Sequence, residues 1–394
     1  MKEVFLSSGA RSALGDFGGS LKSVQFTELA STVAKAALTR SGIKPSAIDH
    51  IVFTTTCPTD KDSLFSARVV GMKTGLPESA AALDVSRACA SGLQAIISAG
   101  QQLQSGHSKL ALAAGAEMFS RAPYAVTTSR WGNARGNQQL EDILEWCYRC
   151  PFSLEYMGDT AENLAEKYQY KREEMDEYAV ASQSRALAAI ESGFLAKQIV
   201  PITVVEGKST RIFETDEAPR EGITLERLAK LKPAFQEGGK VTAGNSSGVT
   251  DGAAALIVGD KDGFAQQGVT PEARLVDWAV VGVPPSLMGH GPVPAIRELL
   301  ERTKLRIEDI DYFEINEAFA VVNLHAEKQL GIPRNKHNLY GGGISVGHPP
   351  GVTGLRMAMN GMQHLNETQG RYAVLSMCLG AGQGLAMLIE RAAN

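Results

Sequence analysis

The stretches TRSGIKPSAIDHIVFTTT (residues 39–56) and ERTKLRIEDIDYFEINEA (residues 301–318) decide how this chain is organised, because they are two copies of one pattern. In each copy a helical segment ends in a short polar turn, which leads through Ile-Asp into an apolar strand. The offset from Ile48 to Ile310 is 310 − 48 = 262 residues. A shared pattern of this length indicates an internal repeat.

A second pair of segments agrees with the offset. The apolar strand at 110–117 falls on the strand at 372–379, and both strands run into small, glycine-rich turns. The repeat therefore predicts two duplicated α/β halves packed together. The middle of the chain, roughly 119–243, is then an insertion, and it holds the irregular stretch SRWGNARGNQQLEDILEWCYRCPF. Long irregular loops in compact folds are usually functional.

Short apolar runs alternate with longer amphipathic segments, as in α/β proteins. Strands are predicted at 4–9, 50–56, 81–85, 109–116, 254–259, 311–316 and 372–378. Helices with apolar residues at steps of three and four are predicted at 27–41, 92–105, 153–169, 171–192, 291–303 and 318–330. The helix at 92–105 has unusually few charged residues for its length, so we expect it to be buried on all sides.

Composition excludes several classes of function. The chain has 394 residues, 44% of them hydrophobic, which suffices for two or three domains. A net charge of −4 does not indicate binding to nucleic acid or to a membrane surface. We expect no signal sequence, transit peptide or membrane span. The five cysteines lack the spacing of a disulfide scaffold, so a reducing cytoplasm is the expected location.

Cys89, in LDVSRACASGLQAI (residues 83–96), stands where an apolar strand ends in a turn of small residues and a helix begins. Unpaired N–H groups at the start of a helix stabilise a thiolate. A sharp turn at the end of a strand also presents nucleophiles in other folds. Because most cysteines are buried, a structural cysteine remains an alternative from this segment alone.

A nucleophilic cysteine needs a base, and His348 in YGGGISVGHPPGVTG (residues 340–354) is the best candidate. The glycines and prolines around it indicate tight turns and close approach of the backbone, not core packing. Five other histidines lie on predicted helix faces or near loops, where we expect them at the surface: His50, His107, His325, His337 and His364.

Two further polar positions follow predicted strands. Cys378 lies in SMCLGAGQG, where the glycines free backbone N–H groups to point into a site, although a glycine-rich strand end is the alternative. Asn316 and Glu317, in FEINEAFA, stand between a strand and a helix, and an N-cap is as good an interpretation as a catalytic one.

Taken together, these motifs resemble those of the thiolases over essentially the whole chain. The resemblance lies in VSRACASG (85–92), INEAFA (315–320), GGGISVGHPPGVTG (341–354) and CLGAGQG (378–384). MGDTAENLAEKY, LAKLKPAF, VTAGNSSGVTDGAAA and MGHGPVPAI are further matches. The resemblance implies a thiolase-like five-layered αβαβα fold from two repeated halves, with an inserted loop domain. The expected boundaries are 1–118 plus 244–268 for the N-terminal half, 119–243 for the inserted, CoA-binding loop domain and 269–394 for the C-terminal half.

The resemblance also implies roles for single residues. Cys89 would accept the acyl group after His348 removes its proton, and Cys378 would move the proton at the α-carbon of acetyl-CoA. One oxyanion hole would consist of His348 and a water held by Asn316. The other would consist of the backbone N–H groups of Cys89 and Gly380. Coenzyme A or acetyl-CoA acts as a substrate, and neither a resident cofactor nor a metal is expected.

Further residues are assigned to coenzyme A and to the acyl group by the same resemblance: Arg220, Phe235, Ala243 and Ser247 for CoA, and Met157 and Met288 for the acyl pocket. A basic neighbourhood is expected in the inserted domain, although a solvated face explains each of its members better. These are Lys208, Arg211, Arg227, Lys230 and Lys232. Ordinary core packing is compatible with the roles of both methionines.

The chain departs from the family at possible specificity positions, namely Tyr156, His290 and Tyr340, with Arg149 nearby. Polar side chains facing only an alkyl group cost free energy, so the acyl group is predicted to be larger than acetyl and to have polar, aromatic or carboxylate character. The alternative, left open, is that these side chains point away or bond one another. Cys147 and Cys150 form a C-x-x-C, which we interpret as free thiols because two ligands do not make a zinc site.

Two other functions compete with a thiolase. A ketoacyl-synthase-type condensing enzyme usually has a second histidine where this chain has Cys378. An inactive binding or scaffold subunit would lack one of the four catalytic residues, and none is missing. The resemblance further implies a homodimer or homotetramer, in keeping with the strand LALAAGA (110–116), which we interpret as a fully buried edge.

Overall fold

Eleven strands form one mixed sheet in the computed structural model, which describes residues 2–132 and 135–392. The strand order is β13-β14-β15-β12-β1-β11-β5-β3-β4, and in addition β2 pairs with β11 and β8 with β1. The strands are β1 Val4–Ser12, β2 Gly15–Asp16, β3 His50–Thr54, β4 Ala81–Val85, β5 Leu110–Glu117, β6 Tyr124–Ala125, β7 Glu141–Asp142, β8 Ile199–Val200, β9 Ile202–Glu206, β10 Ser209–Phe213, β11 Thr250–Gly259, β12 Ala273–Gly282, β13 Tyr312–Ile315, β14 Tyr372–Leu379 and β15 Gln383–Arg391.

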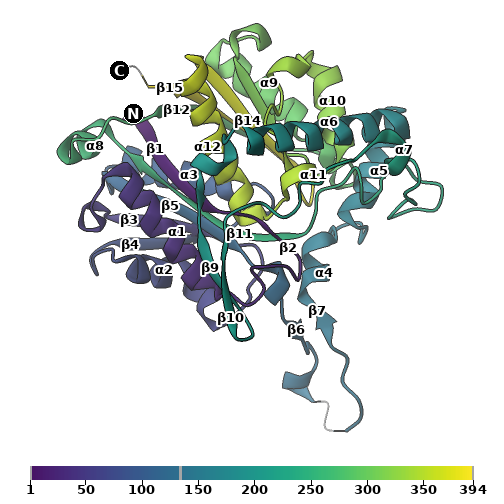
Figure 1. Ribbon diagram of the computed structural model, residues 1–394, viewed down its shortest axis with the longest axis horizontal. Helices are drawn as coiled ribbons and strands as arrows, with labels where there is room; N and C mark the ends of the chain where they lie inside the picture. Colours follow the sequence, from purple (N-terminus) through teal and green to yellow (C-terminus); the bar gives the residue numbers. More distant parts are fainter. Residues whose placement is uncertain (1, 133–134, 393–394) are drawn as a thin grey trace.

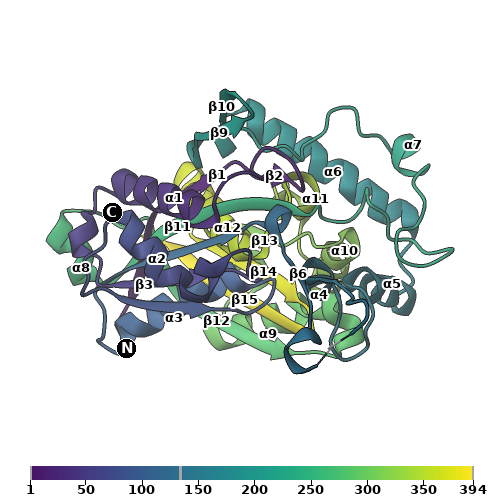
Figure 2. The same cartoon turned by 90° about the horizontal axis from the view of Figure 1, so that it is seen from below.

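The helices divide the molecule into five layers (Figures 1 and 2). Helices α3 and α12 lie between the two halves of the sheet, α1 and α2 cover the first half, and α9 with α10 covers the second. The helices are α1 Phe26–Ser41, α2 Ser66–Thr74, α3 Ser91–Gln104, α4 Ile143–Tyr148, α5 Met157–Lys167, α6 Arg172–Glu191, α7 Leu225–Leu228, α8 Lys261–Gln267, α9 Pro292–Thr303, α10 Ala320–Leu330, α11 Gly343–Val346 and α12 Pro350–Thr368. The predicted five-layered α/β fold is confirmed.

The internal repeat is confirmed by the pairing of the strands. In the first half β3 and β5 are parallel, while β5–β11 and β11–β1 are antiparallel. In the second half β13 and β14 are parallel, while β14–β15 and β15–β12 are antiparallel. The offset of 262 carries the bounds of β5 onto those of β14, since 110 + 262 = 372 and 117 + 262 = 379.

The central helix α3 is buried as predicted, with Leu93, Ile96 and Ile97 at most 1% exposed. Its partner α12 was not among the predicted helices, because the glycines and prolines in its sequence interrupt the helical pattern. Those glycines are what the packing requires: a Cβ on Gly354 would lie 2.2 Å from the backbone N of Leu93. The backbones of the two helices therefore touch.

The strand β5 is buried, but the prediction that it forms an edge is wrong, because β5 lies inside the sheet between β11 and β3. The edge of the first half is β4, where Leu83 is 36% exposed and three of its neighbours are exposed too. An apolar edge strand that faces water is a surface on which other chains pair.

Four of the five histidines expected at the surface are buried, so that expectation is wrong for them; only His107 is exposed. Partners inside the protein explain three of the buried rings. His325 contacts Tyr170 and His290, His337 contacts Glu327, and His364 contacts the Tyr340 hydroxyl. The fourth, His50, lies in β3.

The inserted segment has two parts. Helices α5 and α6 pack on the second half, with α6 against α10 and α11. The hairpin of β6 and β7 forms an arm that projects from the body in Figure 1. Helix α5 begins at Met157, later than predicted, because Cys150 and Glu155 close a turn just before it. The arm and its base expose large hydrophobic side chains, namely Tyr124, Trp131, Leu140, Trp146, Phe152 and Leu154. Across the described ranges, no helix has the length and apolar character needed to cross a membrane.

Candidate active site

Cys89 stands in a sharp turn between β4 and α3. The preceding residue, Ala88, has a φ of 44°, a left-handed conformation that residues other than glycine seldom adopt. Ser91 fixes the turn, since its hydroxyl accepts from the Arg87 N–H at 2.8 Å and donates to the Ala88 carbonyl at 2.7 Å. The predicted position of Cys89, between a strand and a helix N-terminus, is confirmed.

One cavity of about 270 Å³ brings six of the predicted site residues together. Cys89, His348 and Gly380 line it, as do Met157, Met288 and Ser247. The remaining walls are mostly apolar and come from several loops: Thr56, Ser86, Ala88, Phe119, Cys147, Tyr148, Gly248, Ala318, Phe319 and Pro350. The cavity is therefore bounded by parts of both halves and by the inserted segment.

Burial favours the thiol form of Cys89 over the thiolate. Burial raises the pKa of this thiol, while hydrogen bonds from the backbone N–H groups of Gly380 and of Cys89 itself act in the opposite direction. The helix N-terminus was expected to stabilise the thiolate, but burial outweighs it. A base must therefore take the proton before the sulfur can attack a substrate.

His348 is buried and held at both ring nitrogens. Its Nδ1 lies 2.8 Å from the Thr353 hydroxyl, which donates to the Pro349 carbonyl at 3.0 Å. Because that hydroxyl proton is used, Nδ1 carries the ring proton, and Nε2 accepts from the Asn316 amide at 3.2 Å. Burial, together with the charge of Arg356, lowers the pKa of His348 to about 3. The ring is thus neutral, and the lone pair that can take a proton is on Nε2, where the Asn316 amide now donates to it.

Asn316 follows β13 and its side chain is buried beside His348. Its Oδ1 has no hydrogen-bond partner among the described residues. If the N and O of the Asn316 side-chain amide were exchanged, one of the two atoms would still contact His348 and the other would still have no partner. Buried polar atoms of this kind are usually satisfied by a water or a ligand, so Asn316 has an unused hydrogen-bonding atom next to His348.

Cys378 lies at the end of β14, behind the cavity rather than in its wall. Burial raises the pKa of its thiol, and the nearby Cys89 raises it further. The two sulfurs are therefore electrostatically linked: a charge on one opposes a charge on the other. Gly380, two residues on, brings its N–H to Cys89.

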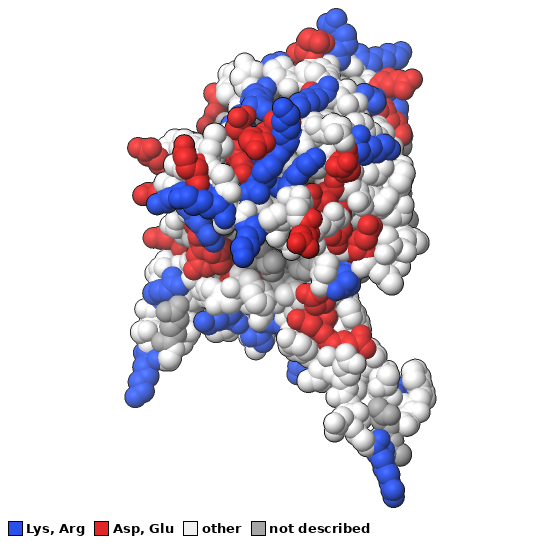
Figure 3. Space-filling model, turned by 90° about the vertical axis from the view of Figure 1, so that its right-hand side faces the viewer, with Lys and Arg blue, Asp and Glu red and all other residues white. Residues whose placement is uncertain are grey.

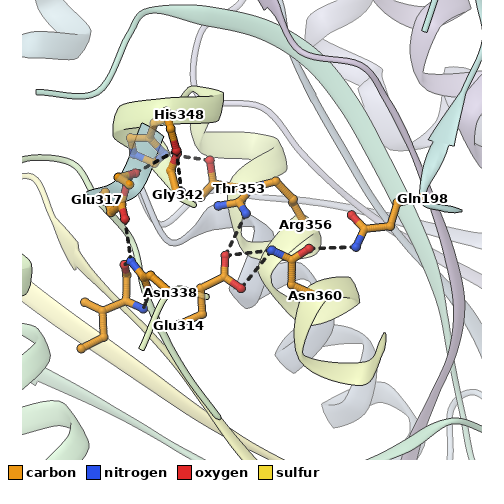
Figure 4. Close-up of polar contacts among 12 residues, drawn as sticks. Gln198, Glu314, Glu317, Asn338, Gly342, His348, Thr353, Arg356 and Asn360 are labelled. Atoms are coloured by element: carbon orange, nitrogen blue, oxygen red, sulfur yellow. Dashed lines mark hydrogen bonds and ion pairs between the residues drawn. The ribbon is translucent and has the colours of Figure 1, made fainter. Parts of the chain in front are cut away.

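Behind the loop of His348 lies a buried polar network (Figure 4). Glu317 accepts from Asn338 at 3.0 Å and from the backbone N–H of Ile344 at 3.2 Å, which fixes the glycine-rich loop before His348. Glu314, in β13, accepts from two residues further along α12, from Arg356 at 2.8 Å and from Asn360. Asn360 in turn accepts from Gln198.

A second cavity, of about 410 Å³, adjoins the first. Ser247 and Gly248 line both cavities, and Arg220 and Ala243 line the second. Phe235 is not among the lining residues of either cavity, but its ring lies edge-on to Phe319, a wall residue of the first cavity, with 6.1 Å between the ring centroids, and it packs against Gly158. Three of the four residues expected to hold CoA thus line the second cavity, and one of them, Ser247, also lines the cavity of Cys89.

The expected basic neighbourhood is only partly gathered. Arg227 lines the second cavity, whereas Lys208, Lys230 and Lys232 are exposed outside it. Arg211 donates to the Ser20 hydroxyl from β10. Acidic and basic side chains are mixed over the face shown in Figure 3, and the projecting arm is largely uncharged.

The four possible specificity residues lie outside the walls of the first cavity, and each has a partner. Arg149 donates to the Tyr156 hydroxyl and covers its ring, and that hydroxyl donates to Glu145. The Nδ1 of His290 lies 2.8 Å from the Nε2 of His325. The ring of Tyr340 stacks on Phe194, and its hydroxyl is hydrogen-bonded to His364. The free-energy cost assigned to them in the acyl pocket therefore does not arise.

Several wall residues of the cavity were not predicted from the sequence, among them Thr56, Phe119, Tyr148 and Phe319. A signal existed for two of them, because Thr56 and Phe119 follow directly on β3 and β5, whose ends meet at one side of a parallel pair. Tyr148 lies in the irregular stretch that was expected to be functional. Cys147 and Cys150 are free thiols, as predicted, and Cys147 lines the cavity.

The fold and the cysteine–histidine cavity define an acyl-transferring enzyme of the thiolase type. The family model of the thiolase N-terminal domain matches residues 4–262, and that of the thiolase C-terminal domain matches residues 269–391. The chain belongs to the thiolase family and is a thiolase acyltransferase.

Similar proteins agree over the full length. The chain is 42% identical to "Beta-ketothiolase BktB" of Cupriavidus necator, covering 99% of both chains. It is 40% identical to "Beta-ketoadipyl-CoA thiolase" of Pseudomonas aeruginosa, again over 99% of both. The crystal structure of the Bacillus anthracis acetyl-CoA acetyltransferase has a TM-score of 0.96 at 41% identity, covering 100% of this chain and 99% of that chain. Human mitochondrial 3-ketoacyl-CoA thiolase in complex with CoA has a TM-score of 0.95 at 39% identity, covering 99% and 98%.

The pKa of His348 generates a prediction about stability. A histidine whose pKa is about 3 in the folded chain and about 6.5 in the unfolded chain binds its proton first in the unfolded chain. It therefore stabilises the fold above pH about 6.5, and this stabilisation is lost as the pH falls towards about 3, by up to about 1.4 kcal/mol per pH unit. Urea unfolding of the wild type should show this slope between pH 7 and 4.

The matched variant is His348→Asn, which keeps a donor near the position of Nδ1. It should lose this part of the slope, while the other buried histidines contribute equally to both proteins and cancel in the comparison. Equal slopes for the two proteins would show that His348 is not held neutral by the fold.

Proposed function

We propose that this thiolase cleaves 3-ketoacyl-CoA with coenzyme A, or forms it in the reverse Claisen condensation, through an acyl group carried on Cys89. The observation that carries the proposal is the shared cavity of Cys89, His348 and Gly380, with Cys378 directly behind it. A general base, a nucleophile, oxyanion donors and a second proton carrier are the groups that such a reaction requires.

The first half of thiolysis uses the neutral His348. Its Nε2 takes the proton of Cys89, and the sulfur attacks the 3-keto carbonyl. The developing oxyanion is stabilised by the N–H groups of Cys89 and Gly380. The bond between the α- and β-carbons then breaks, its electron pair forms the enolate of acetyl-CoA, and Cys378 gives that enolate its α-proton. His348 and a water held by Asn316 stabilise the enolate oxygen.

The second half returns the enzyme to its resting state. Cys378, which gave its proton to the enolate, takes the proton from the thiol of a new CoA, and the CoA sulfur attacks the thioester on Cys89. The bond between the acyl carbon and the Cys89 sulfur breaks, the sulfur regains its proton from His348, and the shortened acyl-CoA leaves. Two cysteines are needed because Cys89 is acylated when Cys378 must move a proton. Acylation also removes the charge of Cys89, which otherwise opposes ionisation of Cys378.

Coenzyme A is proposed to lie along the path from the second cavity to Cys89. Ser247 and Ala243 would contact the pantetheine, Phe235 would pack beside it, and Arg220 would lie near the nucleotide. Backbone and hydroxyl groups orient such a ligand while a guanidinium suits its phosphates. We therefore keep the division into halves 1–118 plus 244–268 and 269–394, with 119–243 as the inserted CoA-binding domain.

A ketoacyl-synthase-type condensing enzyme is the alternative within the same fold class. Cys378 argues against it, because such enzymes usually have a second histidine there. An inactive scaffold subunit is disfavoured because all four proposed catalytic residues are present. The cytoplasm remains the proposed location, since the five cysteines are all free thiols, as a reducing compartment requires.

The acyl group is proposed to be larger than that of acetoacetyl-CoA and apolar or aromatic. Phe119, Tyr148, Met157, Met288 and Phe319 supply its surroundings. No Lys, Arg, Asp or Glu is among the lining residues in the part of the chain that the structure describes. A carboxylate on the acyl group is therefore disfavoured, since Arg149 and His290 bond other partners.

A homodimer or homotetramer is proposed from two exposed apolar surfaces. The edge strand β4 presents unpaired backbone groups and Leu83, immediately before the turn of Cys89. The projecting arm exposes Trp131 and Phe152, at 87% and 74%. Surfaces of this kind are usually covered by another chain.

The first prediction concerns the two cysteines. Cys89→Ala should lose both turnover and the covalent acyl adduct while it still binds CoA. Cys378→Ala should still form the adduct on Cys89 from an acyl-CoA but fail to exchange the α-protons of acetyl-CoA. Mass spectrometry of the intact proteins after mixing with acyl-CoA, with deuterium exchange in parallel, measures both. An acyl adduct on the Cys89→Ala protein would overturn the assignment.

The second prediction concerns the substrate. The kcat/KM for a medium-chain 3-ketoacyl-CoA should exceed that for acetoacetyl-CoA by at least about tenfold, because each buried methylene adds binding in an apolar pocket. A 3-keto-dicarboxyl-CoA should be cleaved less well than the medium-chain compound. Cys147→Phe, which narrows the cavity, should reduce the preference, and His290→Ile, outside the cavity, should leave the ranking unchanged. Best cleavage of acetoacetyl-CoA contradicts the proposal.

The third prediction concerns assembly. Light scattering at micromolar concentration should give a dimer or tetramer, and Leu83→Lys should lower the mass because a charge on an edge strand opposes pairing. Lys73→Ala, on the same side of the sheet but in α2, serves as the control for a surface substitution. A monomeric wild type would argue against the proposal.

A further inference from the structure

Glu117, the last residue of β5, is a fully buried carboxylate. It has 0% exposure, and no cation is among its described hydrogen-bond partners. Unpaired buried charges are costly, so an isolated carboxylate needs hydrogen bonds in their place. The partners come from two segments far apart in the sequence, the loop after β3 and the first turn of α12.

The described partners of Glu117 are donors, and the single proton of the Thr55 hydroxyl is shared between Glu117 and the Cys57 carbonyl at 3.2 Å. Oε1 accepts from the Thr55 hydroxyl at 3.1 Å and from the Cys57 N–H at 3.0 Å. Oε2 accepts from the Thr56 hydroxyl at 2.8 Å and from the Gly351 N–H at 3.0 Å, and the Thr56 N–H lies 3.2 Å from both oxygens. Burial raises the pKa of Glu117, but these hydrogen bonds act the other way. Since three of the donors are peptide N–H groups, which cannot accept a proton, the arrangement suits an ionised carboxylate.

The two segments that Glu117 joins both lead to the active site. Thr56 lines the acyl cavity itself, and Phe119, two residues after Glu117, lines it too. On the other side, Gly351 follows Pro350, a further wall residue, and belongs to the turn of α12 from which Thr353 holds His348. The contact is close: a Cβ on Gly351 would lie 3.0 Å from the Ala116 carbonyl and 3.3 Å from Glu117 Oε2.

The charge of Glu117 reaches the cavity as well. Burial is the largest cause that raises the pKa of the Cys89 thiol, and the Glu117 carboxylate adds to it. Burial also raises the pKa of Tyr148, and Cys147 and Glu117 add to that effect. Because both groups form part of the same cavity, the buried charge lies just beneath the space where the substrate would react.

We propose that Glu117 is a positioning residue for the reaction: it ties the wall of the acyl cavity to the loop of His348 across the two halves of the fold. Its negative charge has a second, smaller effect, which is to add to burial in favouring the thiol form of Cys89. The proposal rests on the proposed role of Cys89 as the nucleophile. Glu117 itself lies outside the cavity wall and does not touch the substrate.

The test separates geometry from charge with two variants. Glu117→Gln keeps the volume but loses the charge and presents an amide NH₂ to groups that are themselves donors. Glu117→Asp keeps the charge but is one methylene shorter. Glu162→Gln is the matched control, because Glu162 is also buried and accepts the N–H groups of Lys240 and Val241, away from Cys89.

Two quantities are measured. The first is the pH midpoint for alkylation of Cys89 by iodoacetamide, followed by mass spectrometry of the Cys89 peptide so that the other thiols are distinguished. The second is kcat for 3-ketoacyl-CoA thiolysis, together with the KM for CoA. The alkylation needs no turnover, so the two proposals can fail separately. A wild type whose Cys89 is alkylated normally but which cleaves no 3-ketoacyl-CoA would refute the proposed function. The effect of Glu117 on Cys89 would still be tested by the pH midpoint of alkylation.

For Glu117→Gln we expect the midpoint to move to lower pH by about half a unit or more, because a nearby negative charge is removed. The kcat should fall at least about tenfold, since small displacements of catalytic groups are costly, while the KM for CoA stays within about twofold. For Glu117→Asp the midpoint should stay at the wild-type value while kcat falls. Glu162→Gln should leave the midpoint unchanged.

A merely structural role would give a lower melting temperature with an unmoved midpoint, and that result in Glu117→Gln would overturn the proposal. If Glu117→Gln does not fold, Glu117→Asp decides: a wild-type kcat in that variant contradicts a positioning role. A shift of the midpoint in Glu162→Gln as large as that in Glu117→Gln would also contradict the proposal, because the shift would then not depend on where the carboxylate lies relative to Cys89.

Discussion

The contact between the backbones of α3 and α12 is the constraint on which the site depends. Gly92 and Gly354 let the two helices touch, since a side chain on either would meet the other backbone within 3 Å. Cys89 lies just before the first turn of α3, and His348 lies just before the first turn of α12. The glycines therefore set how far the sulfur and the imidazole are from each other, although neither residue belongs to a helix.

Buried carboxylates hold the loops around this pair. Glu317 binds the loop before His348, Glu314 neutralises Arg356 on α12, and Glu117 joins α12 to the end of β3. In each case the acceptor lies at or near the end of a strand and the donors lie in a loop or helix of another segment. Hydrogen bonds to a charged group are stronger than neutral ones, and they leave little freedom for the loops they bind. A neutral His348 with a fixed tautomer is the chemical result.

The duplication explains both what could be predicted and what was missed. A repeated Ile-Asp before a strand located β3 and β13, and the offset located β5 and β14. The same offset carries Ser91–Gln104 onto 353–366, within α12, but the periodicity of that segment was hidden by the glycines that its packing requires. Four histidines were wrongly placed at the surface, because a ring's partners, such as Glu327 for His337, come from elements that the local pattern does not reveal.

What the sequence determined by itself was local or repeated: the strand and helix types, the two halves, and the small-residue turns that place Cys89, Asn316, His348 and Cys378 at the ends of elements. The turns around His348 and Cys378 contain glycines and prolines for reasons of backbone conformation, which the sequence displays directly. Only the tertiary structure decided which side chains share a cavity. It put Thr56, Phe119 and Tyr148 around Cys89, and it gave Arg149, His290 and Tyr340 partners outside it. Such choices depend on distances between segments far apart in the chain, and those distances are set by packing, not by the local order of residues.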